Sequence, residues 1–348
     1  MTRAYIVAGG TGGHINAALS IGEALESEFK VIYITGKRPL DLRLFKNKNV
    51  IHVNAKPLRG KGKLQTLWNV CVNVALLLKF IILFISKKPN IIIGAGGYVC
   101  GPPLLASKLF KTKIYILEQN SVMGMTNKLL AAISDKIFTN FSTTKNLPEK
   151  YQQRVLRVGN PVRSNIKNTA QVLEEKVKIL IFGGSLGAKQ INDIIPSIIN
   201  QKFSRPISII HQTGETSDNQ KVISNNENEY QALSYIDDMN EKYHWANLLI
   251  TRAGASTLTE LAIIQKPSVL IPYPQAVDDH QTLNARSFSK ESDFYVSVID
   301  SKLKDKELAE AVILEIEKII NKGFESKSTP TEDAVGKIKN EVLNDNRI

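Results

Sequence analysis

Short runs of β-branched and aliphatic residues alternate with longer helical patterns along almost the whole 348-residue chain. Strands are predicted at 4–8, 31–35, 50–53, 90–94, 114–117 and 136–138, and then at 178–182, 207–211, 231–236, 248–250 and 268–271. Helices are expected to begin near His14, Leu64, Pro102, Met123, Ala188, Ala255 and Asp278. Such alternation is typical of parallel sheets covered by helices on both faces. The pattern pauses at Gly159-Asn160-Pro161 and restarts, so we expect an α/β chain with two Rossmann-like domains, 1–160 and 161–348.

Three glycine-rich turns, 9–13, 94–97 and 183–187, each follow a predicted strand and precede a predicted helix. Glycine lets backbone N–H groups approach an anion, and the following helix adds its positive end. None of the turns carries the lysine of a nucleotide-binding P-loop. A dinucleotide fingerprint starting at Gly10 would need glycine where Ile15 stands, and Lys37 and Arg38 occupy the place of its acid. Basic residues there would suit NADP, so the interpretation as a dehydrogenase is less favoured but stays open.

A hydrolase is the second alternative, because Gly183-Gly184-Ser185-Leu186-Gly187 matches the G-x-S-x-G nucleophile elbow. Asp278, Asp279 and His280 could supply the other members of a triad. An acid and a base adjacent on one helical turn do not easily line up behind a serine. The hydrolase also leaves the other two glycine turns unexplained.

The segment 251–261 closes a predicted strand and opens a helix with small residues. Such a helix start exposes amides to a pyrophosphate, and Glu260 could accept hydrogen bonds from ribose hydroxyls. The alternative for Glu260 is a surface acid that complements the helix dipole. A polar cluster, 278–285, follows the next strand, where ligands of open α/β sheets bind. No D-x-D triplet occurs, so no metal site is predicted and helix N-termini would have to stabilise the leaving group.

Charge divides unevenly along the chain, whose net charge is +12. Up to Arg163 there are 24 basic and 7 acidic residues, a net +17, and the remainder carries −5. This asymmetry predicts that a polyanion or an anionic membrane faces the first half. The two cysteines lack metal-site or disulfide spacing, and Met1 leads directly into a strand pattern, so a cytoplasmic chain without a signal peptide is expected.

The segment 67–85 is almost entirely apolar, interrupted by Asn69, Asn73 and Lys79 and flanked by basic residues. A buried crossover helix is one interpretation. The other, which the charge of the first half favours, is a helix whose apolar edge dips into a bilayer while basic residues meet lipid head groups. The expected membrane patch consists of Trp68, Leu76, Leu77, Phe80 and Phe84.

Together these motifs, from about 4 to about 286, resemble the GT-B glycosyltransferases, and among them the bacterial enzymes that add N-acetylglucosamine to lipid-linked muramyl-pentapeptide. The resemblance implies two Rossmann-like domains with parallel sheets facing across a deep cleft, the first binding the acceptor and the second UDP-N-acetylglucosamine. The last helix, about 331–344, could pack back on the first domain.

The implied reaction is inverting transfer to the 4-hydroxyl of undecaprenyl-pyrophosphoryl-N-acetylmuramyl-pentapeptide, in peptidoglycan synthesis. The implied place is the cytoplasmic face of the inner membrane, as a peripheral protein. Implied partners are an anionic membrane surface and other cell-wall synthesis and division proteins, with no cofactor, metal or nucleic acid. A diacylglycerol glycosyltransferase and a UDP-sugar 2-epimerase stay open as alternatives.

The resemblance also implies roles for single residues. Donor-binding residues would be Thr11, Gly12, Gly13, Asn120, Arg163, Ser185, Ile236, Ala255, Ser256, Thr257, Leu258, Thr259, Glu260 and Gln281. Acceptor-binding residues would be His14, Gly97, Tyr98, Asn120 and Asn192.

His14 is the first candidate for the general base, because it opens a helix whose N-terminus favours a neutral imidazole. Its alternative role is a hydrogen bond to phosphate. Glu118, the only acid between Asp41 and Asp135, is the second candidate, with a structural role in a nearby loop as its alternative. The chain departs from the family at Asn16-Ala17, at Cys100 and at Leu117, and all of these positions are on the acceptor side.

Overall fold

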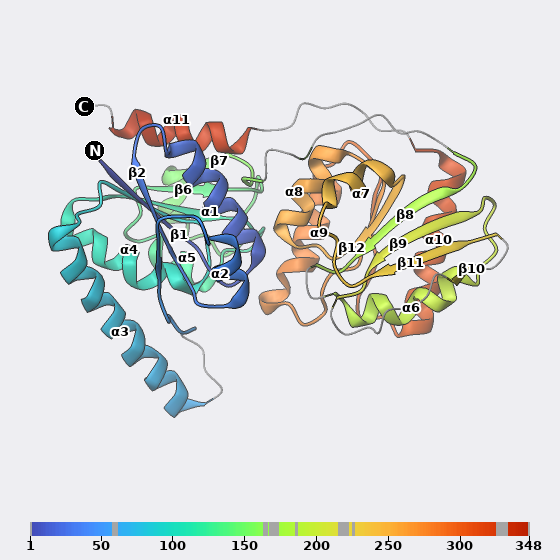
Figure 1. The fold of residues 1–348 in the computed structure, drawn as a ribbon, viewed down its shortest axis with the longest axis horizontal. Coiled ribbons are helices and arrows are strands. Elements are labelled where there is room, and N and C mark those ends of the chain that lie inside the picture. Colours follow the sequence, from blue (N-terminus) through green and yellow to red (C-terminus); the bar gives the residue numbers. More distant parts are fainter. Residues whose placement is uncertain are drawn as a thin grey trace. The chain divides into compact units, whose positions relative to one another are not determined.

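The structure, a computed structural model, describes residues 2–57, 62–162, 166, 174–184, 187–214, 223–224, 227–324 and 333–346. The chain forms two compact units, one of Met1–Ser164 with Glu332–Ile348 and one of Asn165–Thr331. Each unit is built on a sheet of strands that are nearly all parallel (Figure 1). The expectation of two parallel-sheet α/β domains is confirmed.

The first unit alternates strands and helices in sequence order. Its elements are β1 (Arg3–Val7), α1 (Gly12–Leu25), β2 (Lys30–Thr35), α2 (Pro39–Leu44), β3 (Val50–His52), α3 (Lys63–Ser86), β4 (Ile91–Gly94), η1 (Tyr98–Cys100), α4 (Gly101–Ser107), η2 (Lys108–Phe110), β5 (Lys113–Glu118), α5 (Met125–Leu130), β6 (Lys136–Thr139), η3 (Glu149–Arg154), β7 (Val155–Arg157) and α11 (Ala334–Asn346). The strand order is β3-β2-β1-β4-β5-β6-β7, and every pairing is parallel. The edge strand β7 was not predicted, because its three residues carry too short an apolar pattern.

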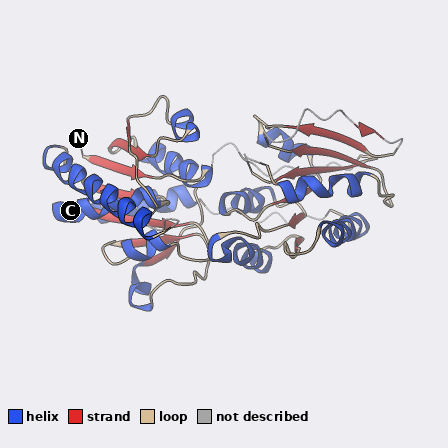
Figure 2. Ribbon diagram, turned by 90° about the horizontal axis from the view of Figure 1, so that it is seen from below, coloured by secondary structure: helices blue, strands red, loops and turns tan. Residues whose placement is uncertain are grey.

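Alternation of side chains along β1 divides the core of the first unit into two layers. Ala4 and Ile6 face a cluster that includes α1 and α11, whereas Tyr5 and Val7 face a cluster that includes α3 and α4. Successive strand residues point to opposite faces of a sheet, so a strand apolar on both faces must be covered twice. Helices accordingly lie on both sides of these strands (Figure 2).

The second unit repeats the architecture. Its elements are β8 (Val177–Phe182), α6 (Lys189–Ile199), β9 (Ile207–Gln212), β10 (Ile223–Ser224), β11 (Glu229–Leu233), α7 (Met239–Trp245), β12 (Leu248–Thr251), α8 (Ala255–Ile264), β13 (Ser268–Leu270), η4 (Val277–Asp279), α9 (His280–Glu291), β14 (Val296–Val298) and α10 (Asp305–Lys322). The strand order is β10-β11-β9-β8-β12-β13-β14, and only the edge pair β10–β11 is antiparallel. The short strands β10 and β14 were not predicted.

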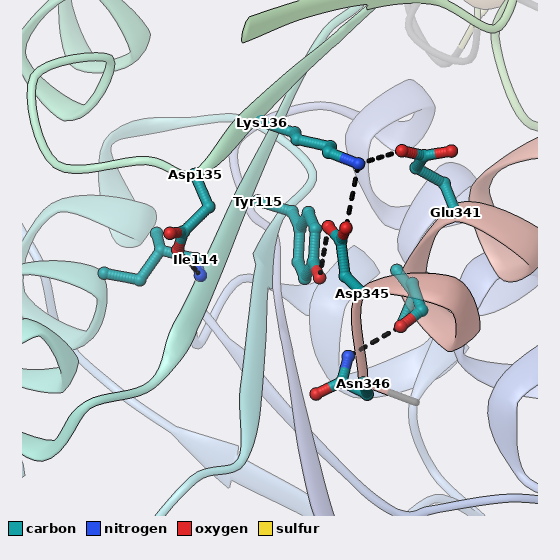
Figure 3. A network of polar contacts seen from close by, with 8 residues as sticks. Ile114, Tyr115, Asp135, Lys136, Glu341, Asp345 and Asn346 are labelled. Atoms are coloured by element: carbon teal, nitrogen blue, oxygen red, sulfur yellow. Dashed lines mark hydrogen bonds and ion pairs between the residues drawn. The ribbon is translucent and has the colours of Figure 1, made fainter. Parts of the chain in front are cut away.

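The final helix α11 belongs to the first unit. Its Ile338 and Val342 are buried in the cluster that includes α1. The Lys136 ammonium pairs with Glu341 and, at 2.9 Å, with Asp345, and the Tyr115 hydroxyl donates to Asp345 at 3.1 Å (Figure 3). Burial, together with Asp345, raises the pKa of Tyr115, which keeps its phenol protonated as the donor. Apolar packing and this polar network therefore hold the end of the chain on the first sheet.

Helix α3 corrects part of the predicted membrane patch. Phe80 and Phe84 are 1% and 0% exposed and pack under the sheet, with the Phe84 ring 5.1 Å from that of Tyr5. Asn69 and Asn73 lie on the same inward stripe and donate to the carbonyls of Pro57 and Lys56. The prediction was wrong for both phenylalanines, because the i, i+4 spacing that starts from the two asparagines places them on the covered side of the helix.

The opposite face of α3 is apolar and exposed. Trp68 is 65% exposed, in agreement with the expected patch, whereas Leu76 and Leu77 are half-buried. The exposed apolar residues are Leu64, Leu67, Trp68, Val70, Val74, Leu78, Ile82 and Ile85. By length and composition α3 could cross a membrane, and 17% of its most apolar window is buried. In Figure 1 its N-terminal half extends away from the rest of the first unit.

Candidate active site

Each sheet has one point at which the strand order reverses. In the first unit the chain runs outward from β1 through β2 to β3 and then returns to place β4 on the other side of β1. In the second unit the same reversal separates β8 from β12. Ligands of open α/β sheets bind beyond the carboxyl ends of the strands at such switch points. All three predicted glycine turns follow one of these strands, as does segment 251–261.

His14 lies in the first turn of α1 beside the first glycine loop. Thr11 caps the helix and accepts from the His14 backbone N–H at 3.4 Å. The His14 Nδ1 lies 3.1 Å from the carbonyl oxygen of Gly9. Because a carbonyl only accepts, Nδ1 carries the proton, and in the neutral ring Nε2 then has the lone pair. The loop therefore holds the imidazole in the tautomer of a base.

The second glycine loop packs against the first. The Gly9 N–H donates to the Gly96 carbonyl at 3.2 Å. A Cβ at Gly96 would lie 2.7 Å from His14 Nε2, and a Cβ at Gly97, whose φ is +89°, would lie 2.1 Å from the Gly9 oxygen. Only glycine allows this close approach of two loops. The glycines at 96 and 97 thus place His14, in addition to exposing amides.

Two residues outside the predicted set complete this loop pair. The buried Gln119 amide donates to the Gly13 carbonyl at 3.5 Å and to the Ala95 carbonyl at 3.4 Å, which joins the two loops. Arg38 donates from Nη1 to the Gly10 carbonyl at 2.7 Å and from Nη2 to the Tyr98 hydroxyl at 2.9 Å. Arg38 is exposed, so a guanidinium stands beside the first loop, where it can meet a phosphate. The sequence signal that could have indicated Arg38 is its position in the loop after β2, at the carboxyl edge of the sheet.

Glu118 is 3% exposed at the end of β5, and burial raises its pKa. Its Oε1 accepts from the backbone and side-chain amides of Asn120 at 3.0 and 3.2 Å. Its Oε2 accepts from the Gly124 N–H and the Asn127 amide, both at 2.9 Å. Four donors on one carboxylate organise the loop between β5 and α5. This geometry favours the structural alternative for Glu118 over the role of base, and it ties Asn120 to the same loop.

The departures from the family pattern lie close to these loops. Cys100 is buried, with its thiol 3.3 Å from the carbonyl oxygens of Val7 and Gly96, and burial raises its pKa to about 12. The thiol therefore donates to the loop as an un-ionised group. Ala17 and Leu117 are fully buried in the core. Neither side chain can contact an acceptor directly.

In the second unit, helix α8 begins without a side-chain cap. Gly254 occupies the cap position, and Ala255, Ser256 and Thr257 form the first turn. The Thr259 hydroxyl bonds back to the Ala255 carbonyl at 2.9 Å, and the Leu258 side chain is buried. Uncapped N–H groups at a helix start are suited to an anion. Leu258 can therefore contribute only its backbone to a donor site.

Glu260 is partly buried on α8, where its Oε2 accepts from the Tyr243 hydroxyl at 2.5 Å. This bond fixes one carboxylate oxygen on the side of α7. The buried Lys266 donates to the Tyr243, His244 and Ala246 carbonyls and so holds the end of α7 in place. The position of Glu260 is thus determined by α8, which carries it, and by Tyr243 on α7.

Gln212, buried at the end of β9, links two further predicted positions. Its amide donates to the Gly184 carbonyl at 2.8 Å, and its Oε1 accepts from the Ile236 N–H at 2.9 Å. The Ile236 N–H is therefore already bonded within the protein. Asn192 on α6 donates to the Thr213 carbonyl at 3.0 Å, which places this predicted acceptor residue in the second unit.

The loop before α9 has a strained backbone. Asp278 and Asp279 have φ of +52° and +50°, a conformation that is uncommon outside glycine. Gln281 accepts from the Tyr273 N–H at 2.9 Å, which links its side chain to the loop that follows β13. The His280 Nδ1 contacts the Val277 carbonyl at 2.8 Å rather than a carboxylate, which does not fit the triad of a hydrolase.

Arg252, absent from the predicted set, is 7% exposed beside the same loop. It donates to the Ile271 and Pro272 carbonyls at 3.0 and 2.8 Å, and burial lowers its pKa to about 10. The predicted residues Arg163 and Ser185 lie outside the described residues. Within the described ranges no three His, Cys, Asp or Glu side chains gather as they would around a metal ion.

Comparison with known proteins assigns this arrangement to a family. Residues 4–139 match the N-terminal domain of glycosyltransferase family 28, and residues 178–342 match its C-terminal domain. Two relatives are named UDP-N-acetylglucosamine–N-acetylmuramyl-(pentapeptide) pyrophosphoryl-undecaprenol N-acetylglucosamine transferase. The one from Francisella philomiragia is 37% identical and the one from Shewanella amazonensis 35% identical, each over 82% of this chain and 81% of the relative.

A solved structure agrees with these sequences. The crystal structure of Acinetobacter baumannii MurG covers 99% of this chain and 100% of its own, with 25% identity and a TM-score of 0.74. The sequence matches extend through both units and include both switch points. The chain therefore belongs to glycosyltransferase family 28, within the group of N-acetylglucosamine transferases that these relatives represent.

Proposed function

We propose that this chain transfers N-acetylglucosamine from UDP-N-acetylglucosamine to the 4-hydroxyl of the muramyl sugar in undecaprenyl-pyrophosphoryl-N-acetylmuramyl-pentapeptide, with inversion. The names of its relatives, which it matches over four-fifths of their length, support the two substrates. The observation that carries the chemistry is the His14 imidazole, held by the Gly9 carbonyl with its Nε2 as the basic atom.

The first domain supplies the base. The Nε2 of His14 takes the proton of the acceptor hydroxyl as that oxygen bonds to the anomeric carbon. The bond from this carbon to the UDP oxygen breaks, and its electron pair leaves with UDP. General base catalysis of this kind contributes about 10²- to 10⁴-fold in rate. Arg38 and the amides of the glycine loops hold the acceptor diphosphate beside the base.

The second domain holds the donor. The uncapped start of α8 binds the diphosphate and stabilises the charge that develops on the leaving UDP. Glu260 accepts from the ribose hydroxyls, the Ile236 carbonyl contacts the uracil, and Gln281 contacts the sugar. Asn192 on α6 and, outside the described residues, Arg163 and Ser185 complete the substrate contacts.

A membrane surface brings the lipid-linked acceptor to the enzyme. The exposed face of α3 supplies apolar contact, and exposed Lys63, Lys79, Lys87 and Lys88 surround it. Each basic residue near an anionic surface contributes about 1 kcal/mol. The protein is thus a peripheral one, bound at the cytoplasmic face of the inner membrane through α3.

Transfer of radiolabelled sugar to defined acceptors tests the reaction. Wild-type protein is given labelled UDP-N-acetylglucosamine with a short-chain analogue of the muramyl-pentapeptide lipid, with diacylglycerol, or with no acceptor. Label on the muramyl lipid alone, with inverted anomeric configuration, is expected. Label on diacylglycerol would support the lipid glycosyltransferase instead, and epimerised sugar without an acceptor would support the 2-epimerase.

Vesicle co-sedimentation tests the membrane surface. The variant Trp68→Glu/Ile82→Glu changes two exposed residues of α3 and should lose binding to anionic vesicles while keeping transfer to a water-soluble acceptor. The matched control Leu156→Glu changes an exposed leucine on β7 and should bind as wild type. Equal loss in both variants, or in neither, would contradict a specific role for α3.

A further inference from the structure

An apolar groove of about 190 Å³ lies in the first unit between α3, α4 and α5. It is lined mainly by aliphatic side chains, among them Val70, Val74, Leu77, Leu105, Leu129 and Leu130. Leu105 and Leu129 are 46% and 58% exposed, so the groove is open to the surface. Open apolar surface of this kind is unfavourable in water unless a ligand or partner covers it.

The groove shares a wall with the proposed diphosphate site. Tyr98 and Gly101, which follow the second glycine loop, also line it. The Tyr98 hydroxyl accepts from Arg38 Nη2 at 2.9 Å, and the Arg38 carbon Cζ lies 5.9 Å from the centre of the Tyr98 ring. The other arm of Arg38 reaches the first glycine loop at Gly10. The pair Arg38–Tyr98 therefore lies between the proposed diphosphate site, to which Arg38 contributes positive charge, and the apolar groove, which Tyr98 lines.

We propose that this groove binds the first isoprene unit of the acceptor lipid, while Arg38 contacts the adjoining diphosphate; this inference rests on the proposed function. An isoprenyl diphosphate joins an anion directly to a branched five-carbon unit, which matches a guanidinium beside an aliphatic groove. The volume also fits, because an apolar cavity of about 150 Å³ accommodates a benzene-sized molecule. The groove thus selects the lipid by the unit nearest its diphosphate.

The position of the groove favours the acceptor over an ordinary bilayer lipid. A phospholipid has a glycerol ester between its phosphate and its first chain carbons. In this structure the groove lining meets Arg38 directly through Tyr98, and the described lining residues include no further cation. On the exposed face of α3, Val70 and Val74 also line the groove, whereas Leu64, Leu78 and Ile82 do not line it and remain for the bilayer.

Calorimetric titration of the whole protein with geranyl diphosphate, inorganic pyrophosphate and geraniol tests the proposal. Wild type should bind geranyl diphosphate at least about tenfold more tightly than pyrophosphate, because burial of one isoprene unit removes several CH₂-sized groups from water. Leu105→Trp, which fills the groove, should abolish this difference. Arg38→Met should weaken both diphosphates equally.

Leu156→Trp is the matched control, since Leu156 is 37% exposed on β7 and does not line the groove. It should bind all three probes as wild type, and near-ultraviolet circular dichroism should show both tryptophan variants folded. Equal affinity of wild type for the two diphosphates would overturn the proposal. Unchanged geranyl diphosphate binding in Leu105→Trp would do so as well.

Kinetics with two acceptors separates this inference from the proposed function. The muramyl-pentapeptide diphosphate is attached either to a two-carbon tail or to a ten-carbon isoprenyl tail. Leu105→Trp should raise KM for the ten-carbon acceptor about tenfold and leave the two-carbon acceptor unchanged. Equal effects on both acceptors would overturn the groove while leaving the transferase intact. Sugar transfer by wild type to neither acceptor would instead overturn the proposed function.

Discussion

The switch points of the two domains share a backbone design and differ in their side chains. In the first domain Gln119 ties the two glycine loops together, and in the second Gln212 ties Gly184 to Ile236. Beside its glutamine-linked loops, the first domain carries the imidazole of His14 and the exposed guanidinium of Arg38. The second domain presents an uncapped helix and buries its own arginine, Arg252, among carbonyls. In the proposed function, one scaffold thus serves proton transfer and acceptor binding in the first domain and donor binding in the second.

The largest effect should come from His14→Ala in the first domain. The transfer rate should fall by about 10²- to 10⁴-fold, the contribution of a general base. His14→Gln, which keeps a polar group but cannot take the proton, should fall as far, as measured by steady-state kinetics with both substrates saturating. A nearly normal rate in His14→Gln would show that the imidazole only binds phosphate.

Glu260→Gln should damage the second domain in a different way. Losing a charge-assisted hydrogen bond to ribose costs about 1.5–3 kcal/mol, so KM for the donor should rise by about 10- to 100-fold. The rate at saturating donor should change little. The check is to repeat the kinetics with a 2′,3′-dideoxyribose donor, which lacks both hydroxyls and on which wild type and Glu260→Gln should converge. A persistent difference would mean that Glu260 acts elsewhere.

His14 and Glu260 were accessible to sequence reasoning for the same reason. His14 and Glu260 each follow a glycine or small-residue turn at the end of an apolar strand, and such turns can be recognised in the letters. Arg38 and Gln119 could not be assigned, because their roles depend on contacts with loops 28 and 24 or more residues away along the chain. Alternation predicted the sheets, but not the three-residue edge strands.

Helix α3 shows the same limit in packing. Its apolar run was evident, whereas the choice of its exposed face required the partners of Asn69 and Asn73. Both asparagines donate hydrogen bonds to the segment before the helix, and the buried Phe80 and Phe84 lie on the same face of α3. Because phenylalanine suits a protein core and a membrane equally, the apolar run by itself did not show which face of α3 is buried.

Acid should affect the second domain through His211. This residue is 1% exposed, and burial lowers its pKa to about 4. Between pH 6.5 and 4 the unfolded chain binds more protons than the folded one, so stability falls as the pH falls. From pH 6.5 to 5 the loss should be at most about 2 kcal/mol.

Urea unfolding followed through Trp245, in a Trp68→Phe background, reports on the second domain and measures this loss. His211→Leu should remove the pH dependence over that range. If His211→Leu unfolds with the same pH dependence as its parent, another group is responsible.

The smallest effect should come from the network that holds α11 on the first domain. Lys136→Met removes a half-exposed ion pair with Glu341 and Asp345 and should lower stability by about 1 kcal/mol or less. Urea unfolding followed through Trp68, in a Trp245→Phe background, checks this value. The control Lys318→Met breaks the pair between the exposed Lys318 and the partly buried Glu315 on α10 and should not change the Trp68 transition.

The division of labour between the domains is tested most directly by labelled sugar transfer in wild type, His14→Ala, Glu260→Ala and the double variant. Measured as kcat/KM for the donor, the two losses should multiply, because a base on one domain and a ribose contact on the other act independently. Donor affinity should fall only where Glu260 is changed. A double variant no slower than His14→Ala, or a loss of donor affinity in His14→Ala alone, would contradict the account.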